Sequence, residues 1–237
     1  MVLETAVIIA GGEGSRLAPL TSDRPKTLVE VSGKPILYWI LQWLKKNGIK
    51  NIVLGVAYKK EKIYDYMKAN KNFGFNTEFS EHTVEGGTAE AFRLAIANHV
   101  KDDTFLALNS DELTNLEVGR VHRTHSEKND AIATLVLAPF YSKFSIVHFD
   151  ESKTVTGFKY GSKIDGVYIS NGIYVFSNDI LKYMPESGSI EDTVFRKLAG
   201  TGKIRSYVMT DDEEWYSINT PKDIKEIEAT KPKWLVD

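Results

Sequence analysis

The chain of 237 residues contains no cysteine. This absence excludes disulfide bonds, thiolate metal sites and cysteine nucleophiles together. The sequence also lacks the run of about 18 apolar residues that a membrane-spanning helix needs. The apolar start Met1–Ala10 carries Glu4 and leads directly into glycines, which is unlike a secretory signal. We therefore expect a protein of the cytoplasm that has no membrane partner.

An excess of basic residues is missing as well. The chain has 30 Lys and Arg against 32 Asp and Glu, and a formal net charge of −2. This balance argues against a dedicated nucleic-acid surface. Hydrophobic residues make up 42% and charged residues 26%, as in soluble globular domains, so disorder and fibrous structure are excluded. We expect one domain over residues 1–237, because no linker, repeat or low-complexity segment divides the chain.

The first half alternates short apolar runs with helical patterns. The run Ala6–Ala10 is apolar throughout, as expected of a strand that is buried on both faces. Pro35 suits the first turn of a helix, and Gly48 suits the position just beyond its end. The predicted strands are Ala6–Ala10, Asn51–Ala57, Phe75–Ser80, Thr104–Leu108 and Ala131–Ala138, and the predicted helices are Lys34–Asn47, Glu61–Ala69 and one from Thr88. This alternation predicts an α/β fold with a mostly parallel sheet and helices on both faces.

The second half changes character. Ser145–Phe149 and Val155–Phe158 flank a short polar segment, which predicts a hairpin and an antiparallel addition to the sheet. The other predicted elements are a strand over Val167–Phe176, helices near Ile180 and over Ile190–Ala199, a strand over Ile204–Met209 and a helix over Pro221–Ala229.

A glycine-rich loop follows the first strand, with the sequence Gly11-Gly12-Glu13-Gly14-Ser15-Arg16 and then Pro25-Lys26. Glycines let backbone N–H groups approach an anion, because no Cβ intervenes. Ligands of open α/β sheets bind at the carboxyl ends of strands, where this loop would lie. Arg16 and Lys26 add fixed positive charge suited to a triphosphate. The order matches neither the Gly-Lys-Ser/Thr phosphate loop nor the Gly-x-Gly-x-x-Gly dinucleotide motif.

The whole string Gly-Gly-x-Gly-x-Arg-Leu-x-Pro-Leu-Thr-x-x-x-Pro-Lys, followed by Gly33-Lys34-Pro35, resembles the signature of the sugar-1-phosphate nucleotidyltransferases. These enzymes join a nucleoside triphosphate to a sugar phosphate and release pyrophosphate. The resemblance implies a Rossmann-like α/β/α sandwich, with a nucleotide-binding half over residues 1–130 and a sugar-binding half over 131–237. It implies that Arg16 neutralises the leaving pyrophosphate and that Lys26 bridges the α-phosphate and the acceptor phosphate. The implied nucleotide-binding residues of the loop are Ala10, Gly11, Gly12, Gly14 and Ser15.

Two further segments resemble nucleotide and metal motifs of the same family. Residues 81–91 resemble Leu-Gly-Thr-Ala-Gly-Ala, which lies against the base, and imply nucleotide contacts from Glu81, Gly87 and Thr88; the alternative is a helix start capped by Thr88. The Gln-Pro segment of the dTTP-using branch is absent, which favours GTP or UTP. Asn109-Ser110-Asp111 corresponds to x-Gly-Asp and implies that Asp111 binds Mg²⁺, the expected cofactor; Glu112 receives no role.

Two segments of the second half resemble sugar-contacting motifs. Asn171-Gly172-Ile173-Tyr174 implies that Asn171 and Gly172 contact the sugar, with a strand bulge at Gly172 as the alternative. Ser189-Ile190-Glu191-Asp192 implies a sugar contact from Glu191, with a helix-capping pattern as the alternative.

The chain departs from the family pattern at two places. Tyr160 stands where many members carry the glutamate of Phe-x-Glu-Lys-Pro, and Ser217 stands where the family's second metal-binding aspartate lies. The carbonyl oxygen of Asn219 is then the expected substitute ligand. We expect a nucleoside triphosphate and a sugar phosphate as partners, and a homo-oligomer stays open. Two other functions also stay open, namely a phosphocholine-type cytidylyltransferase of the same fold and a regulatory protein that binds a nucleotide sugar without turnover.

Overall fold

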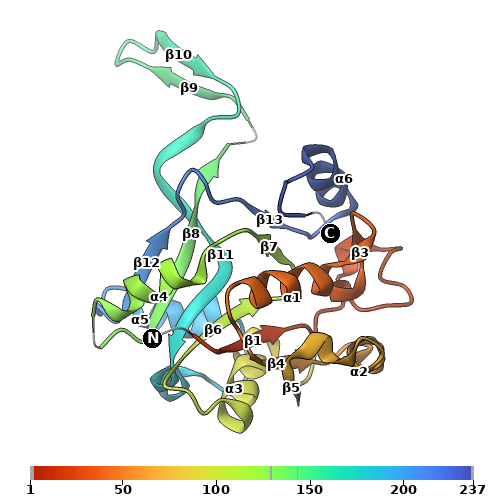
Figure 1. The fold of residues 1–237 in the computed structure, drawn as a ribbon. Coiled ribbons are helices and arrows are strands. Elements are labelled where there is room, and N and C mark those ends of the chain that lie inside the picture. Colours follow the sequence, from red (N-terminus) through yellow and green to blue (C-terminus); the bar gives the residue numbers. More distant parts are fainter. Residues whose placement is uncertain (1–2, 129, 143, 236–237) are drawn as a thin grey trace.

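The computed structural model of the chain describes residues 3–128, 130–142 and 144–235. A seven-stranded sheet with the order β12-β8-β11-β6-β1-β4-β5 forms its centre (Figure 1). The strands are β1 (Thr5–Ile9), β4 (Asn51–Val56), β5 (Asn76–Glu81), β6 (Thr104–Asn109), β8 (Ala133–Tyr141), β11 (Lys163–Ser177) and β12 (Ile204–Val208). Neighbours in the sheet are parallel except β11, which runs antiparallel to both β6 and β8. The predicted mostly parallel sheet with an antiparallel addition is confirmed.

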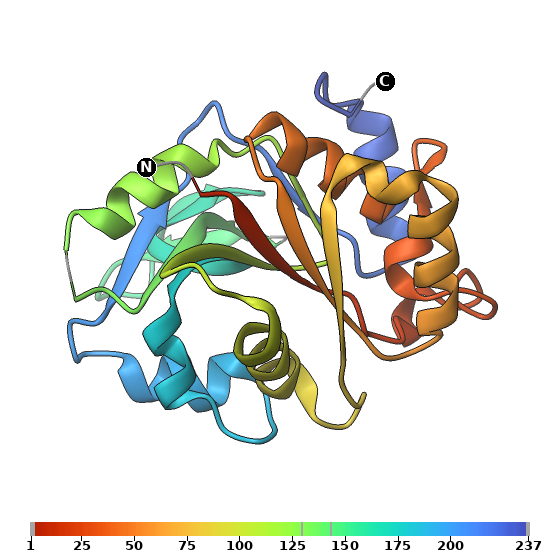
Figure 2. The ribbon, with the colours of Figure 1, turned by 60° about the horizontal axis from the view of Figure 1, so that its bottom comes forward.

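Helices cover both faces of this sheet (Figure 2). One face packs against α1 (Ile36–Lys46), α2 (Lys60–Ala69), α4 (Val118–Ser126) and α6 (Pro221–Thr230). The other face packs against α3 (Gly87–His99), a 3₁₀ helix (Asn178–Tyr183) and a π-helical turn (Glu191–Phe195) that continues into α5 (Arg196–Leu198). None of the helices in the described part of the chain is long and apolar enough to cross a membrane.

The alternation of side chains along β1 explains the two cores. Ala6 and Ile8 belong to the apolar cluster on one face, whereas Val7 and Ile9 belong to the cluster on the other. Successive side chains of a strand point to opposite faces, so a strand covered on both sides must be apolar throughout. The continuous apolar run of the sequence therefore predicts this central position correctly.

Most predicted elements are present with their ends displaced by a few residues, but the helix start at Thr88 needs a correction. α3 begins at Gly87, and the hydroxyl oxygen of Thr88 accepts a hydrogen bond from the backbone N–H of Ile190 at 2.8 Å. Thr88 is therefore inside the helix and does not cap it. The capping alternative at Ser189 is confirmed, because Ser189 Oγ accepts from the backbone N–H of Asp192 at 3.0 Å.

Strands β8 and β11 continue beyond the sheet into an arm that ends in the predicted hairpin, β9 (Ile146–Phe149) and β10 (Val155–Lys159) (Figure 1). On this arm Phe144, Phe158 and Tyr160 are largely exposed. Tyr160 lies outside both cavities described below. The register of β11 against β8 shifts between Ser170 and Tyr174, which confirms the bulge at Gly172.

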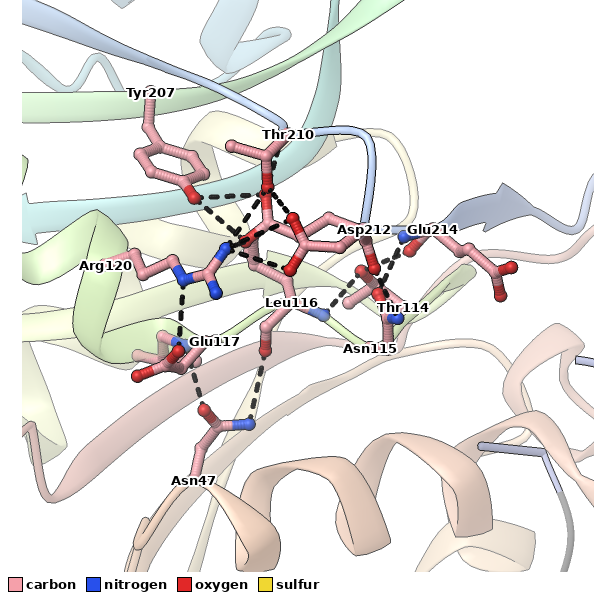
Figure 3. Close-up of polar contacts among 12 residues, drawn as sticks. Asn47, Thr114, Asn115, Leu116, Glu117, Arg120, Tyr207, Thr210, Asp212 and Glu214 are labelled. Atoms are coloured by element: carbon pink, nitrogen blue, oxygen red, sulfur yellow. Dashed lines mark hydrogen bonds and ion pairs between the residues drawn. The ribbon is translucent and has the colours of Figure 1, made fainter. Parts of the chain in front are cut away.

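The sequence patterns do not predict β7 (Glu112–Thr114) and β13 (Trp215–Ser217), which form a separate two-stranded antiparallel sheet. Side chains on both segments hold this pair together (Figure 3). Thr114 Oγ1 donates to the carbonyl of Glu214 at 2.7 Å, and the backbone N–H of Glu214 donates to Asn115 Oδ1 at 2.7 Å. Arg120 at the start of α4 reaches Asp212 at 3.2 Å. The residues that follow β6 are thereby fixed against the residues that precede α6.

His125 on α4 gives the fold a pH-dependent stability. Its side chain is buried, with Nδ1 at 3.0 Å from Thr134 Oγ1, and burial lowers the pKa of His125 from 6.5 to about 4. The unfolded chain then binds a proton that the folded chain excludes, so stability is complete above pH 6.5 and falls as the pH drops toward 4. We expect His125 alone to lower the free energy of unfolding by about 2 kcal/mol between pH 7 and pH 5.

Urea unfolding of His125→Gln at both pH values checks this expectation. The variant should lose that part of the pH dependence. Equal pH dependence in His125→Gln and the unmodified protein would contradict the assignment.

Candidate functional site

A cavity of about 360 Å³ opens at the carboxyl ends of β1 and β6. The loop after β1, the start of α3 and the end of β6 meet there, as the two parallel strands require. Most of the predicted nucleotide, catalytic and metal residues line it, namely Gly11, Gly12, Gly14, Ser15, Arg16, Lys26, Gly87, Thr88, Asp111 and Asn219.

Four charged or polar side chains converge at one end of this cavity. Lys26 Nζ lies 2.5 Å from Asp111 Oδ2 and donates to Asn219 Oδ1 at 2.8 Å. Arg16 Nη2 donates to the same Asn219 oxygen at 2.8 Å. The side chains of Lys26 and Asp111 are only 13% and 19% exposed, so their ion pair is screened much less than a surface pair. The fold thus brings together four residues that are far apart in the sequence, between positions 16 and 219, as the family resemblance implies.

The geometry of the loop explains its glycines. Gly14 has φ +67°, and a Cβ at this position would lie 2.8 Å from Lys26 Cβ. A Cβ on Gly11 would lie 2.3 Å from Nε2 of His82, which packs against the loop backbone. Nothing lies within 4 Å of the corresponding position at Gly12. Gly14 and Gly11 are therefore needed for close packing, and Gly12 leaves open space beside the cavity.

Replacement of Gly14 by alanine tests this packing. Because the left-handed backbone and the contact with Lys26 both oppose a Cβ, we expect Gly14→Ala to lower the free energy of unfolding by about 1–3 kcal/mol. Gly12→Ala is the matched control and should unfold at nearly the unmodified denaturant concentration. Chemical denaturation measures both variants, and equal midpoints would contradict the steric explanation.

The start of α3 is locked to the segment before the π-helical turn. Gly87 has φ +70°, and a Cβ there would lie 2.6 Å from the carbonyl oxygen of Gly188. That carbonyl accepts from the backbone N–H of Ala89 at 2.9 Å. Gly87 and Thr88 therefore form a fixed wall of the cavity, which packs closely against the segment around Gly188.

Other predicted residues lie outside the lining of the cavity. Ala10 is buried beneath the loop, and its N–H donates to the carbonyl of Gly55 at 2.7 Å. The carboxylate of Glu81 is occupied by Lys60 Nζ at 2.5 Å and Tyr64 Oη at 2.9 Å. Burial and this carboxylate raise the pKa of Tyr64 to about 12. The ligand contacts assigned to Ala10 and Glu81 stay predictions.

The predicted sugar residues occupy three different surroundings. Asn171 is buried, and its Oδ1 accepts from the backbone N–H of Ile173 at 3.2 Å. Gly172 lies beside the end of β6, where a Cβ would be 2.8 Å from Asn109 Nδ2 and 3.1 Å from Glu112 Oε1. Glu191 accepts from Tyr174 Oη at 3.2 Å. None of the three is among the residues that line the cavities described here, and their contacts with a sugar stay predictions.

Sequence reasoning missed Glu112 and His82. Glu112 is 6% exposed, and burial together with the charge of Asp111 raises the pKa of its carboxyl well above the usual range. The sequence signal for this burial is weak, since Glu112 follows a predicted ligand and only Leu113 suggests a new strand. His82 lines the cavity, and its Nδ1 lies 2.9 Å from the carbonyl oxygen of Thr83.

A second cavity of about 690 Å³ adjoins the first. Arg16 and Asn219 line both, so the positive charge of Arg16 faces the two cavities together. The remaining lining comes from the root of the arm, including Phe140 and Tyr141, and from the segment 209–226. Two ligands could therefore meet beside Arg16.

The oxygen atoms around Lys26 also fit a divalent cation. Asp111 Oδ2 and Asn219 Oδ1 converge on the same ammonium group, at 2.5 and 2.8 Å. Mg²⁺ commonly takes one or two protein carboxylates and completes its shell with phosphates and water. Among the described residues no group of three or more His, Asp or Glu side chains forms a complete metal site. The donor set thus suits a metal that arrives with a phosphorylated ligand.

Comparison with known proteins agrees with the family resemblance of the sequence motifs. Residues 5–233 match the family model described as nucleotidyl transferase. The chain is 32% identical over 227 residues to the mannose-1-phosphate guanylyltransferase catalytic subunit beta of Drosophila pseudoobscura pseudoobscura, covering 92% of this chain and 60% of the relative. It is 28% identical over 238 residues to the UTP–glucose-1-phosphate uridylyltransferase of Synechocystis sp., covering 92% and 61%. The chain thus spans about 60% of the length of these curated relatives.

Solved structures share the fold. HddC from Yersinia pseudotuberculosis superimposes with a TM-score of 0.74 at 23% identity, covering 97% of this chain and all of that one. The inositol-1-phosphate CTP transferase from T. maritima gives a TM-score of 0.70 at 22% identity, covering 97% and 96%. At these identities the likeness concerns the fold, whereas the family model covers nearly the whole sequence. The chain therefore belongs to the nucleotidyl transferase family.

Proposed function

We propose that the protein transfers a nucleotidyl group from GTP or UTP to a sugar 1-phosphate, with release of pyrophosphate. The observation that carries this proposal is the convergence of Arg16, Lys26, Asp111 and Asn219 in the first cavity, where Arg16 and Asn219 also line the adjoining one. The guanylyl and uridylyl activities in the names of the curated relatives support the choice of base, and their sugar 1-phosphates support the acceptor.

In the proposed reaction an oxygen of the acceptor phosphate attacks the α-phosphorus of the triphosphate. A new P–O bond forms, the bond to the β-phosphate oxygen breaks, and pyrophosphate leaves with its electron pair. No protein nucleophile is needed, because the acceptor already carries an anionic oxygen. The protein contributes orientation and charge stabilisation.

Each residue has a role that follows from its place. The loop from Gly11 to Ser15 holds the triphosphate through backbone N–H groups. Lys26, in the lining of the first cavity, would bridge the donor and acceptor phosphates, and Arg16, which lines both cavities, would neutralise the leaving pyrophosphate. Asp111 and Asn219 would hold Mg²⁺, which when bound reduces the repulsion between the two anionic reactants.

Pyrophosphate release tests this function. The purified protein with Mg²⁺ is incubated with GTP, UTP, CTP, dTTP or ATP, each paired with mannose, glucose, N-acetylglucosamine or heptose 1-phosphate or with phosphocholine. We expect release with GTP or UTP and a sugar 1-phosphate. Release only with CTP and phosphocholine would overturn the acceptor assignment. Binding of a nucleotide without release in any pair would overturn catalysis in favour of a regulatory protein.

A further inference from the structure

Glu112 and Ser217 stand opposite each other in the two-stranded sheet of β7 and β13. Directly opposed residues of an antiparallel pair project to the same side, about 5 Å apart. Ser217 is short, and the longer Glu112 fills the space beside it. Ser217 Oγ donates to Glu112 Oε1 at 3.2 Å, and Trp215 Nε1 donates to Glu112 Oε2 at 2.7 Å. The carboxyl that the family pattern places at position 217 is thus supplied from the neighbouring strand.

Ser217 also connects Glu112 to the side chains around Lys26 through a hydrogen bond with Asn219. Asn219 Nδ2 donates to Ser217 Oγ at 2.7 Å, so the serine hydroxyl accepts from the amide while it donates to Glu112. An amide whose NH₂ is held on one side must present its oxygen on the other. That oxygen accepts from both Lys26 Nζ and Arg16 Nη2.

The orientation of the Asn219 amide matters because the two cations are donors without any acceptor capacity. A flipped amide would turn its NH₂ group toward Lys26 and Arg16 and would leave Asp111 as the remaining acceptor for Lys26. The two cations would then separate from the oxygen that they share. Their spacing determines where a phosphate can bind between them.

We propose that Glu112 is a positioning residue that acts through Ser217 to hold Asn219 Oδ1 toward Lys26 and Arg16. This inference rests on the proposed function for its kinetic part, but the hydrogen-bond relay itself does not. Ser217 is then the middle of a polar chain, and its difference from the family aspartate is compensated by Glu112.

Variants of Ser217 test the relay in the full chain. Ser217→Ala removes the hydroxyl, and we expect kcat to fall about tenfold, the equivalent of one lost hydrogen bond, together with a fall in the unfolding midpoint, because a buried carboxyl oxygen loses its donor. Ser217→Thr keeps the hydroxyl and should restore kcat. Thr114→Val is the matched structural control, because it removes another side-chain bond between the same two segments at 2.7 Å. It should lower the melting temperature and leave kcat unchanged.

A spectroscopic readout separates this inference from the proposed function. The side-chain amide protons of Asn219, assigned by their loss in Asn219→Asp, should exchange slowly with solvent in the unmodified protein. They should exchange faster in both Ser217→Ala and Glu112→Gln, since Ser217 and Trp215 donate to different oxygens of Glu112 and a glutamine has only one oxygen. Unchanged exchange in both variants would overturn the relay even if the protein releases pyrophosphate. Faster exchange in a protein without turnover would support the relay and reject the proposed function alone.

Restoration of the family residue gives a second test. Ser217→Asp places a new carboxylate against the buried Glu112, so we expect a lower melting temperature and no gain in kcat. The double variant Ser217→Asp with Glu112→Gln should recover part of the lost stability, because the glutamine NH₂ can donate to the new carboxylate while its oxygen accepts from Trp215. A rise in kcat in Ser217→Asp alone, with unchanged melting temperature, would overturn the compensation by Glu112.

Discussion

Replacement of Lys26 by alanine is expected to lower kcat/KM for pyrophosphate release about a hundredfold or more while the protein still folds. Lys26 is mostly buried in the lining of the first cavity, and its ammonium group is shared between Asp111 and Asn219. A cation held in this way costs no reorganisation when negative charge develops on the phosphates. The loss should therefore fall mainly on kcat.

The control for this variant is Lys50→Ala. Lys50 precedes β4 at the amino ends of the parallel strands, opposite the cavity, and pairs with Glu4 at 2.6 Å on the surface. Exposed pairs of this kind contribute about 1 kcal/mol or less, so turnover and stability should both be nearly unchanged. Equal turnover in Lys26→Ala and Lys50→Ala would contradict the role of Lys26.

Lys26→Arg separates position from charge. Arginine keeps the positive charge, but its planar guanidinium is larger than the ammonium that fits at 2.5 Å from Asp111 and 2.8 Å from Asn219. We expect turnover between those of Lys26→Ala and the unmodified protein. Steady-state kinetics measure the ranking, and full activity in Lys26→Arg would show that only the charge is needed.

The sequence predicts the parts of this protein whose signals are local. The apolar run before Gly11 predicts a central strand, and Gly14, Arg16 and Lys26 predict an anion site at its end. Parallel pairing of β1 with β6 then brings Asp111 to the same edge of the sheet. These inferences need only strand order and the direction of side chains.

The role of Glu112 could not be predicted, because it depends on pairing between strands about a hundred residues apart in the sequence. Both strands are short, at three residues each, and neither shows enough alternation to be recognised. The sugar contacts of Glu191 and Asn171 depend on motif resemblance alone and stay predictions. Their motifs resemble sugar-binding segments, yet the side chains bond to Tyr174 and to the backbone of Ile173.

Asp111→Asn is the second substitution for which we expect a very large effect. Asn keeps the size of the side chain but removes the negative charge that faces Lys26 and the candidate Mg²⁺ position. We expect kcat/KM to fall about a hundredfold or more, and the Mg²⁺ concentration for half-maximal turnover to rise. Removal of divalent cations with EDTA should abolish turnover in the unmodified protein, and added Mg²⁺ should restore it.

The control is Asp179→Asn. Asp179 is exposed, lies outside the cavity lining, and pairs with Lys182 at a distance of 2.8 Å. Its turnover and Mg²⁺ dependence should match those of the unmodified protein. Near-full activity of Asp111→Asn with unchanged Mg²⁺ dependence would show that another group binds the metal.

The double variant Lys26→Ala with Asp111→Asn decides whether the two residues act as one unit. Because their side chains are in direct contact at 2.5 Å, the two losses should not add. Either single substitution leaves the other group without its partner, and the second substitution then removes a group that is already misplaced. We expect the double variant to be only slightly slower than the slower single one. Losses that multiply in full would mean that Lys26 and Asp111 contribute independently, and that their ion pair separates completely when the substrates bind.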